Sequence, residues 1–364
     1  MSDTFFITGA TGFIGKKLTE RLVAAGQKVR CLARPNSNRE TLKKLGVEFI
    51  DGDLFDCDAL KRGSDGADYV FHIAGLTREL RRGDFEKVNV VGTKNLANVC
   101  AELGAKRFVY VSSLAGAGLA PRARNENDGE EKLYAPRRLR RETDEPKPIS
   151  PYGKSKFNAE KFLVTLAEKL PISVVRPPYV FGKGDWASLK LYEMVKNDGV
   201  IVLPGYFDHY YSFVYVDDLV EFLLAVQARG ESLTADSLTS IESNVSESAE
   251  TCSGVGIYFA ADREAVRFSK FGEYIGAGYG RKKTRAVKVP PVGVLGAGVY
   301  GEIYKAIKRK YPAFDWNKAI EAVRGPWICS GAKAEKTLGV ELKGCLADKI
   351  AETAKWYVDR GLIK

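Results

Sequence analysis

The stretch from Thr4 to Gly15 constrains the fold of this chain more than any other. An apolar segment, Thr4–Thr8, runs straight into a glycine turn, and a segment with the apolar spacing of a helix follows. A strand, a glycine turn and a helix in this order form a phosphate-binding unit, because the unpaired N–H groups at the start of the helix attract an anion. The residues expected to hold a dinucleotide here are Gly9, Thr11, Gly12, Phe13, Ile14 and Gly15.

The three glycines of this turn have separate expected roles. Gly9 permits the tight turn, Gly12 lets a pyrophosphate approach the backbone, and Gly15 lets the helix pack close to the strand. Their spacing is Gly-x-x-Gly-x-x-Gly, which differs from the Gly-x-Gly-x-x-Gly of two-domain dehydrogenases.

The second predicted strand, Lys28–Ala33, indicates which dinucleotide is bound. Arg34 follows it, at the position where an acid would accept a hydrogen bond from the ribose 2′-hydroxyl of NAD. An arginine suits the 2′-phosphate of NADP instead, so NADP is favoured. NAD stays open, because an arginine can also stack on adenine.

Two further segments are predicted to reach the same ligand. Asp53, beside Leu54, is placed to accept from the adenine amino group, although an acid at such a position also serves a turn. Ala74 and Gly75 end the fourth predicted strand with small side chains, where a backbone must approach a ligand. His72, within that strand, is interpreted as a packed strand residue.

Strands and helices alternate through the first half, which is typical of a parallel, doubly wound (Rossmann-type) α/β sheet. We predict a long helix over 85–103 and a strand over 108–113. Strand C-termini face the ligand in such sheets, so Ser112 and Ser113 are expected at the site. The predicted units are a dinucleotide-binding domain over 1–176, to which 213–226 and 256–262 return, a smaller substrate-binding lobe over 177–212 and 263–345, and a C-terminal helix over 346–364.

A second motif supplies acid–base chemistry. Ser150 and Pro151 mark a helix start, because serine caps the free N–H groups and proline suits the first helical position. Tyr152 and Lys156 then lie four residues apart on one face of that helix. A phenol has a pKa of about 10, which a neighbouring ammonium lowers, so the pair can pass a proton to or from a substrate oxygen.

Taken together, these motifs resemble the extended short-chain dehydrogenase/reductase family, also called the NAD-dependent epimerase/dehydratase family. The resemblance extends over nearly the whole chain and includes two later motifs, Arg176–Asp185 and Tyr215–Leu219. It implies an enzyme. A non-catalytic cofactor-sensing relative is the alternative, although such proteins often lose the Tyr or the Lys.

The resemblance also implies roles for individual residues. Ser113 would polarise the substrate oxygen and Tyr152 would be the acid/base. Lys156 would hold the nicotinamide ribose and lower the pKa of Tyr152. Asn89 would support a proton relay, and Pro177 would border the nicotinamide.

The substrate class divides this family. Nucleotide-sugar epimerases and dehydratases usually have Asn at the position of Tyr179 and a diphosphate-binding Arg at that of Tyr211, and tyrosine does not replace that charge. With Tyr206, Phe207 and Tyr210, these side chains suggest an aromatic pocket wall, or ordinary core. The chain is nearest the branch of 3β-hydroxysteroid dehydrogenases and dihydroflavonol reductases. That branch implies hydride transfer between nicotinamide and a secondary alcohol or ketone on a mostly apolar small molecule; a nucleotide-sugar epimerase or dehydratase stays the alternative.

Composition narrows the remaining classes. Two histidines in 364 residues argue against a His-rich metal site and a Ser-His-Asp triad, so no metal is expected. Six scattered cysteines indicate a reducing compartment. No signal peptide or membrane span is predicted, which makes a cytoplasmic location the expectation. A homodimer through the helices over 85–103 and 152–168 is expected, as is common in the family.

The net charge of +10 is unevenly spread. Residues 263–310 hold twelve Lys and Arg against three acids, and they include an uncharged run, 289–300, flanked by cations. One interpretation is an anionic partner, such as a membrane surface or a substrate phosphate; the other is a buried loop and helix with a basic outer side. No nucleic-acid partner is expected. The charged insert 119–148 is predicted to be a surface loop or lid at the site mouth, with a passive insertion as the alternative.

Overall fold

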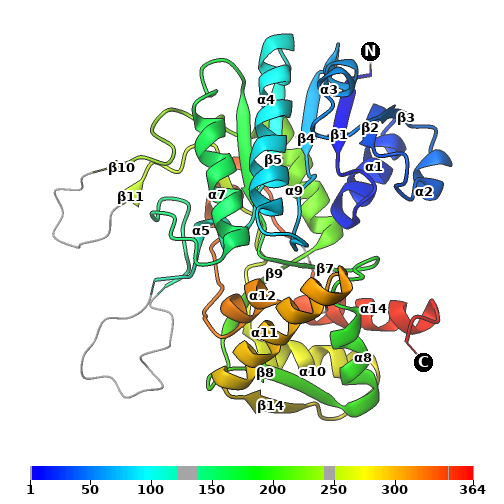
Figure 1. The fold of residues 1–364 in the computed structure, drawn as a ribbon, viewed down its shortest axis with the longest axis vertical. Helices are drawn as coiled ribbons and strands as arrows, with labels where there is room; N and C mark the ends of the chain where they lie inside the picture. Colours follow the sequence, from blue (N-terminus) through cyan, green and yellow to red (C-terminus); the bar gives the residue numbers. More distant parts are fainter. Residues whose placement is uncertain (1, 122–137, 242–250, 313, 343, 364) are drawn as a thin grey trace.

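A computed structural model describes residues 2–121, 138–241, 251–312, 314–342 and 344–363 (Figure 1). Its centre is a seven-stranded sheet in the order β12-β6-β5-β4-β1-β2-β3, in which every neighbouring pair is parallel. The strands are β1 (Thr4–Thr8), β2 (Lys28–Ala33), β3 (Glu48–Asp51), β4 (Tyr69–His72), β5 (Arg107–Val111), β6 (Ile172–Arg176) and β12 (Ile257–Phe259). The predicted doubly wound parallel α/β sheet is confirmed.

Helices cover both faces of this sheet, which is why its strands are largely apolar. Phe6 and Tyr110 face one helical layer, whereas Ile7 and Phe71 face the other, because successive strand residues point to opposite faces. The first layer holds α3 (Cys57–Ser64), α4 (Gly92–Leu103) and α7 (Pro151–Val164). The second holds α1 (Phe13–Ala24), α2 (Glu40–Lys43), α9 (Val216–Arg229) and α13 (Ala332–Leu338).

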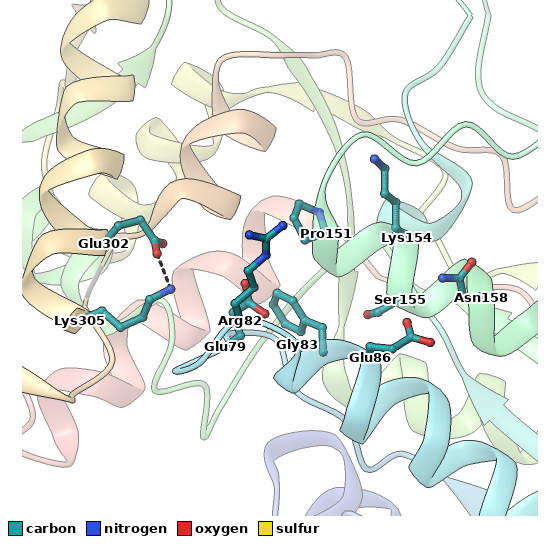
Figure 2. A pocket seen from close by; sticks show the side chains of 11 residues that line it. Glu79, Arg82, Gly83, Glu86, Pro151, Lys154, Ser155, Asn158, Glu302 and Lys305 are labelled. Atoms are coloured by element: carbon teal, nitrogen blue, oxygen red, sulfur yellow. Dashed lines mark ion pairs between the residues drawn. The ribbon is translucent and has the colours of Figure 1, made fainter.

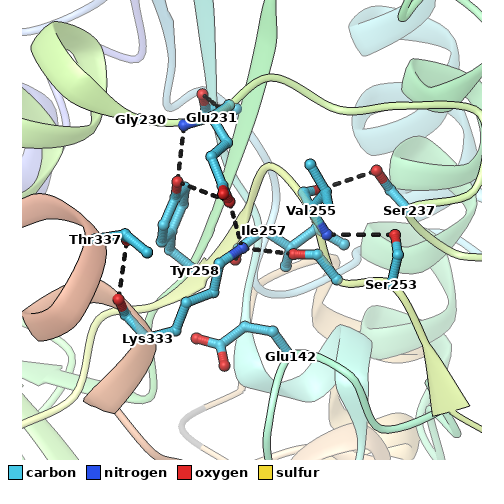
Figure 3. Close-up of polar contacts among 12 residues, drawn as sticks. Glu142, Gly230, Glu231, Ser237, Ser253, Val255, Ile257, Tyr258, Lys333 and Thr337 are labelled. Carbon is cyan, nitrogen blue, oxygen red and sulfur yellow. Dashed lines mark hydrogen bonds and ion pairs between the residues drawn. The ribbon is translucent and has the colours of Figure 1, made fainter.

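A polar network fixes the edge strand β12, which lies within the predicted returning segment 256–262 (Figure 3). The Lys333 ammonium, on α13, donates to the carbonyls of Gly254 and Ile257 at 2.7 and 3.0 Å. It also forms an ion pair with Glu231 at 2.9 Å. The Glu231 N–H donates to the Tyr258 hydroxyl at 2.7 Å, so strand, helix and loop hold one another.

The helix predicted over 85–103 has two parts. It begins as a π-helix, η1 (Glu86–Val91), and continues as α4 from Gly92. A π-helical turn holds one extra residue and is common at functional sites. Asn89, the residue implied in a proton relay, lies in this widened turn.

A smaller lobe lies at the carboxyl edge of the sheet, in the lower half of Figure 1. Its elements are β7 (Tyr179–Phe181), α8 (Leu189–Asp198), β8 (Val200–Pro204), β9 (Tyr210–Tyr215), β13 (Ala265–Arg267), α10 (Phe268–Gly278), β14 (Arg285–Val289), α11 (Pro291–Lys308), α12 (Trp316–Ala322) and α14 (Leu346–Asp359). The predicted C-terminal helix is α14, and it packs so closely on α10 that a Cβ on Gly278 would lie 2.7 Å from the Ala351 carbonyl oxygen.

The segment 213–226, which is predicted to return to the dinucleotide-binding domain, adds no strand to the main sheet. β9 pairs with β7 and β13 instead, and α9 is the part of 213–226 that covers the main sheet. The reason is geometric: β12 already pairs with β6 at that edge of the sheet. The division of the chain into the two predicted domains stays a prediction.

Part of the predicted surface loop 119–148 is buried. Residues 122–137 lie outside the described part of the chain. Beyond them Arg140 is 4% exposed and donates to the Leu119 carbonyl at 2.6 Å, and the Glu142 carboxylate accepts from the Phe259 N–H at 2.9 Å. The segment from Arg138 onward is therefore fastened to β12 rather than lying on the surface, because its charged groups find buried partners.

Two further expectations concern the outside of the molecule. Within the described ranges no helix is long and apolar enough to cross a membrane. The helices α4 and α7 lie side by side on one face of the sheet (Figure 1), and the homodimer expected through them stays a prediction.

Candidate active site

The glycine turn between β1 and α1 is a backbone cradle. Gly9 has a φ of 78°, and a Cβ there would lie 2.6 Å from the Ala74 nitrogen. A Cβ on Gly15 would lie 2.1 Å from the Gly9 carbonyl oxygen, so neither position accepts a side chain. Gly12 is exposed and begins α1 without a side-chain cap. The first N–H groups of α1 are thus open to an anion, and this cradle fits a dinucleotide pyrophosphate.

The other predicted residues of the turn surround this cradle. Thr11, Phe13 and Ile14 are all partly exposed. A Cβ on Gly184 would lie 3.6 Å from the Phe13 ring, so this ring reaches the segment that follows β7 in the smaller lobe. The cradle and the smaller lobe therefore meet at Phe13.

Two guanidinium groups lie at the end of β2, where an adenosine ribose is expected. Arg34 is exposed directly after the strand. Arg39 donates to the Ala33 carbonyl at 2.6 Å and pairs with Asp51, at the end of β3, at 2.5 Å. No motif in the sequence pointed to Arg39, because the turn between the two arginines has no regular pattern.

Asp53 and Leu54 lie at the next strand end. One Asp53 carboxylate oxygen accepts from the Phe55 N–H at 2.8 Å, which is the turn role, and a contact with adenine stays a prediction. The Leu54 side chain is 6% exposed and packs toward α4, since a Cβ on Gly92 would lie 2.8 Å from it. The Leu54 carbonyl accepts from the Asn95 amide at 2.9 Å, and a contact of Leu54 with the cofactor stays a prediction.

The end of β4 joins the cradle to the predicted catalytic helix. Ala74 closes on Gly9, and a Cβ on the next residue, Gly75, would lie 3.1 Å from the Asn89 amide oxygen and 3.6 Å from the Lys156 ammonium nitrogen. The sequence-predicted cofactor residues of β4 and the predicted catalytic lysine are therefore neighbours.

Asn89 holds this junction together. Its amide oxygen accepts from the Leu76 N–H at 2.7 Å, and its amide nitrogen donates to the Leu76 carbonyl at 3.0 Å and to the Ser155 hydroxyl at 2.9 Å. With 1% of the residue exposed, these contacts make Asn89 a positioning residue between β4 and α7. The implied proton relay through it stays a prediction.

His72 is a packed strand residue, as interpreted from the sequence. It is fully buried between the hydroxyls of Thr8 and Thr93, at 2.6 and 2.8 Å from its two ring nitrogens. Burial, and secondarily the charge of Lys156, lower the pKa of His72 to about 3, so the ring is neutral.

Helix α7, which carries Tyr152 and Lys156, begins as predicted. The Ser150 hydroxyl accepts from the Gly153 N–H at 2.9 Å, and Pro151 occupies the first turn. Tyr152 and Lys156 follow on one face. Ser113, which caps α5 (Leu114–Ala117) directly after β5, lies close enough to the Tyr152 phenol to lower its pKa.

The implied lowering of the Tyr152 pKa is wrong for the protein without ligands. Burial raises the pKa of Tyr152 to about 12, and the charge of Glu321 adds to this, whereas the nearby Ser113 side chain opposes it. Lys156 points elsewhere: its ammonium donates to the Val111 carbonyl at 2.7 Å and lies 4.4 Å from the centre of the Tyr110 ring. The Tyr152 phenol is therefore protonated at neutral pH.

The pKa of Lys156 is shifted downward, opposite to that of Tyr152. Burial lowers the pKa of Lys156 to about 7, and the nearby Glu160 carboxylate opposes that shift. Lys156 can therefore gain or lose a proton near neutral pH, which few lysines can do.

The two serines that end β5 have different roles. The Ser113 hydroxyl accepts from the Ala115 N–H at 3.1 Å, and its role at the substrate oxygen stays a prediction. Ser112 is 4% exposed and donates to Glu160, so the expectation that it faces the ligand is wrong. Glu160 also forms a buried ion pair with Arg176 at 2.5 Å. Pro177 follows Arg176, and its carbonyl accepts from the Leu114 N–H at 2.9 Å, which places it beside Ser113.

Glu321 is the functional candidate that sequence reasoning missed. It lies on α12, yet its carboxylate accepts from the Ser150 hydroxyl at 2.5 Å, and its charge acts on both Tyr152 and Tyr211. Burial raises the pKa of Glu321 to about 7. No sequence signal could have found it, because 171 residues separate Glu321 from Ser150.

The aromatic wall is smaller than predicted. Tyr211 packs with Tyr152 against a cluster that includes Leu114 and Trp327, and Tyr179 packs on the Phe213 and Phe271 rings at 5.4 and 5.8 Å. Burial raises the pKa of both Tyr179 and Tyr211, so they too are neutral phenols.

Two of the other tyrosines do not join this wall. Tyr206 is 61% exposed, and the Tyr210 hydroxyl accepts from Arg267 at 3.2 Å. Tyr210 and Tyr211 are successive strand residues, so they point to opposite faces of β9.

A cavity of about 470 Å³ opens beside α7 (Figure 2). It lies between the start of α7, the segment 79–86 and the inner side of α11, where Glu302 and Lys305 form an ion pair at 2.6 Å. The Phe85 ring lines the cavity and lies 5.7 Å from the Tyr152 ring. Phe85 thus contacts both this cavity and Tyr152.

Several arginines of the basic stretch are already occupied. Arg263 pairs with Glu335 and Glu341 at 2.7 and 3.1 Å, and Arg281 donates to the Lys196 carbonyl at 2.7 Å. The guanidinium groups of Arg263 and Arg281 are therefore engaged by other protein groups. This argues against the prediction that the basic stretch supplies ligands for a substrate phosphate. Among the described residues no group of three or more His, Cys, Asp or Glu is arranged to hold a metal ion.

Comparisons with known proteins place this site in context. The family described as "NAD dependent epimerase/dehydratase family" matches residues 5–237. A ceramide reductase of Caulobacter vibrioides (strain NA1000 / CB15N) is 27% identical over 351 residues, which cover 96% of this chain and 93% of that protein. A 3 beta-hydroxysteroid dehydrogenase/Delta 5-->4-isomerase of Mycobacterium tuberculosis (strain CDC 1551 / Oshkosh) is 31% identical over 232 residues, 60% of this chain and 59% of that protein.

A solved structure extends the likeness to the fold. The dTDP-glucose 4,6-dehydratase DesIV of Streptomyces venezuelae, with NAD bound, has a TM-score of 0.69 and 20% identity, and the match covers 99% of both chains. At this identity the likeness shows the fold alone.

Glu321 generates a stability prediction. Its pKa is raised from 4.5 in the unfolded chain to about 7, so the folded protein binds more protons and loses stability as pH rises through that window. Relative to Glu321→Gln, the wild-type protein should lose about 2 kcal/mol of unfolding free energy between pH 5 and pH 8. Urea denaturation of both proteins at the two pH values measures this.

The exposed Glu168→Gln is the matched control and should follow the wild type. Parallel pH dependences for the wild type and Glu321→Gln would contradict the burial of an ionisable carboxyl at this place.

Proposed function

The chain belongs to the NAD dependent epimerase/dehydratase family, and from that membership we propose that it is a reductase that transfers hydride between NADPH, or NADH, and the carbonyl of a mostly apolar substrate. The observation that carries the proposal is the buried, protonated Tyr152 phenol, which like Tyr211 packs against the cluster that holds Leu114 and Trp327. The first relative named above is a ceramide reductase, which agrees with an apolar substrate.

The chain's own residues supply the proton. A carbonyl oxygen placed against both hydroxyls would accept hydrogen bonds from Ser113 and Tyr152, which stabilise the negative charge that develops on it. Tyr152 then donates its proton to that oxygen. A bound nicotinamide supplies the hydride. Lys156, whose pKa is about 7, would turn from Val111 toward the phenolate and stabilise it.

The pKa values favour reduction as the working direction. A phenol with a pKa of about 12 is protonated at neutral pH, so it holds the proton that reduction delivers, whereas it must first lose that proton to act as a base. Oxidation of an alcohol would need that loss, which only a newly placed positive charge near the phenol would favour.

An apolar substrate is favoured over a nucleotide sugar by the groups that face Tyr152. The cluster around it is built from Leu114, Ile149, Tyr211 and Trp327. Tyr211 occupies the place at which nucleotide-sugar enzymes of the family usually carry a diphosphate-binding arginine, and a neutral phenol cannot replace that charge. A nucleotide-sugar epimerase or dehydratase is the second candidate, and it rests on the likeness to the DesIV fold.

A non-catalytic cofactor sensor is disfavoured by the same geometry. A cofactor sensor needs the glycine cradle at Gly9 to bind its ligand. It does not need a serine after β5 near a tyrosine and a lysine on α7, because these side chains serve proton transfer. A homodimer and NADP preference remain part of the proposal, because neither follows from the fold.

Tyr152→Phe tests the mechanism. The variant should lose at least a thousandfold in kcat for NADPH-dependent reduction of apolar ketones such as sterol or long-chain ketones, because only the transferable proton is removed. Its thermal stabilisation by NADPH should match that of the wild type. Tyr210→Phe, which alters a tyrosine turned away from the wall, is the matched control and should retain activity.

A Tyr152→Phe protein that still reduces any accepted ketone at the wild-type rate would refute the assignment. Turnover of nucleotide sugars with no turnover of apolar ketones would instead support the second candidate.

Arg34 generates a cofactor prediction. NADP should bind more tightly than NAD by at least tenfold, and Arg34→Ala should reduce that ratio about tenfold, because a charge-assisted hydrogen bond to the 2′-phosphate is lost. Calorimetric titration of both cofactors into the wild type and the variant measures the ratio. Arg360→Ala, a surface arginine after α14, is the control. Equal affinities for the two cofactors, unchanged by Arg34→Ala, would remove Arg34 from the site.

A further inference from the structure

Helix α11 turns its large apolar side chains outward. Val292, Val299, Tyr300, Ile303 and Ile307 are 79%, 48%, 69%, 52% and 70% exposed. Val292 lies seven residues, or about two turns, before Val299. Ile303 and Ile307 follow Tyr300 at spacings of three and four, so the five side chains form one stripe along the helix. A surface helix ordinarily presents its apolar stripe to the core, so this arrangement is inverted.

The inner face of α11 explains how the helix stays attached without these side chains. Gly298 and Gly301 face inward, and Cβ atoms there would lie 2.6 Å from the Ala319 Cβ and 2.1 Å from the Phe314 carbonyl oxygen. Glu302 and Lys305 also turn inward and form the ion pair that lines the cavity beside α7 (Figure 2). Two glycines, a charge pair and the buried Val294 side chain thus make the contact with the protein.

Both ends of the stripe carry cations. Lys288 precedes the helix, and Lys308, Arg309 and Lys310 end it; all four are exposed. Among the residues that the structure describes in α11, Glu302 is the one acid, and it faces the cavity.

We propose that the outer face of α11 docks the protein on the surface of an anionic lipid bilayer. The helix is about 27 Å long and would lie in the plane of the interface, with the stripe among the acyl chains and the flanking cations at the headgroups. This is a surface contact: no helix in the described ranges is able to span a membrane.

A second copy of the chain fits the same face less well. If two α11 helices packed antiparallel, the cations at the C-terminus of one helix would lie against Lys288 of the other copy. If they packed in parallel, Lys308 and Lys310 would lie against the same residues of the other copy. Either arrangement brings like charges together beside an apolar seam. Anionic headgroups satisfy both ends at once.

The test is co-sedimentation of the full chain with vesicles. Phosphatidylcholine vesicles with phosphatidylglycerol should carry the protein down at low salt, pure phosphatidylcholine vesicles should carry much less, and high salt should release it. The paired substitution Ile303→Gln and Ile307→Gln should lower the partition coefficient at least tenfold, because two large side chains no longer enter the acyl region. Leu103→Gln, at a similarly exposed leucine on α4, is the matched control.

The charged part of the proposal has its own variant. The pair Lys308→Gln and Lys310→Gln should lower binding to anionic vesicles at least tenfold, since each cation near such a surface contributes about fivefold. The pair Lys169→Gln and Lys355→Gln removes the same charge from other exposed positions and should bind nearly as the wild type does. Circular dichroism of each variant checks that the fold is kept.

Three results would overturn the proposal. The first is wild-type protein that stays in the supernatant with anionic vesicles at low salt, and the second is α11 variants that bind as tightly as their controls. The third is a dimer in analytical ultracentrifugation that the Ile303 and Ile307 substitutions convert to a monomer, because the face would then belong to a second copy.

Discussion

The buried ion pair between Glu160 and Arg176 fixes the geometry on which the site depends. Glu160 lies one turn after Lys156 on α7, Arg176 ends β6, and Ser112 at the end of β5 donates to the same carboxylate. This network therefore sets the catalytic helix against the two strands that carry Ser113 and Pro177. Removing one member of such a pair typically costs about 3 to 5 kcal/mol, because the other charge is left buried and unpaired. The positions of Tyr152 and Lys156 thus follow from a charge pair that takes no part in the chemistry.

Much of this arrangement could be predicted from the sequence, because it is local. The glycine turn, the Ser150 cap and the spacing of Tyr152 and Lys156 are short-range patterns whose geometry follows from backbone sterics and helix periodicity. The parallel sheet follows from the alternation of elements. The cofactor contacts of Arg34 and Asp53 remain expectations, since a strand-end residue has several possible uses.

What could not be predicted depends on contacts between distant segments. Glu321 reaches Ser150 from α12, and Ser112 turns to Glu160 although its neighbour Ser113 lies near the phenol. The predicted lowering of the Tyr152 pKa is wrong because burial raises it to about 12. The four-residue spacing of Tyr152 and Lys156 does not indicate how deeply the phenol is buried. In α11 the apolar residues repeat as in a core helix, but glycines at the contact let the helix pack with its apolar stripe outside. Each of these features follows from tertiary packing, which local sequence patterns do not show.

The most direct measurement of the central claim is the ionisation of Tyr152 itself. Tyrosinate formation is followed by ultraviolet difference absorption as pH is raised, for the ligand-free wild type and for Tyr152→Phe, and subtraction isolates the one phenol. The account predicts that this phenol stays protonated through neutral pH and ionises with a pKa of about 12. A Tyr152 signal that titrates near neutral pH in the ligand-free protein would show a phenolate prepared by Lys156, and it would contradict the protonated proton donor on which the proposed reduction rests.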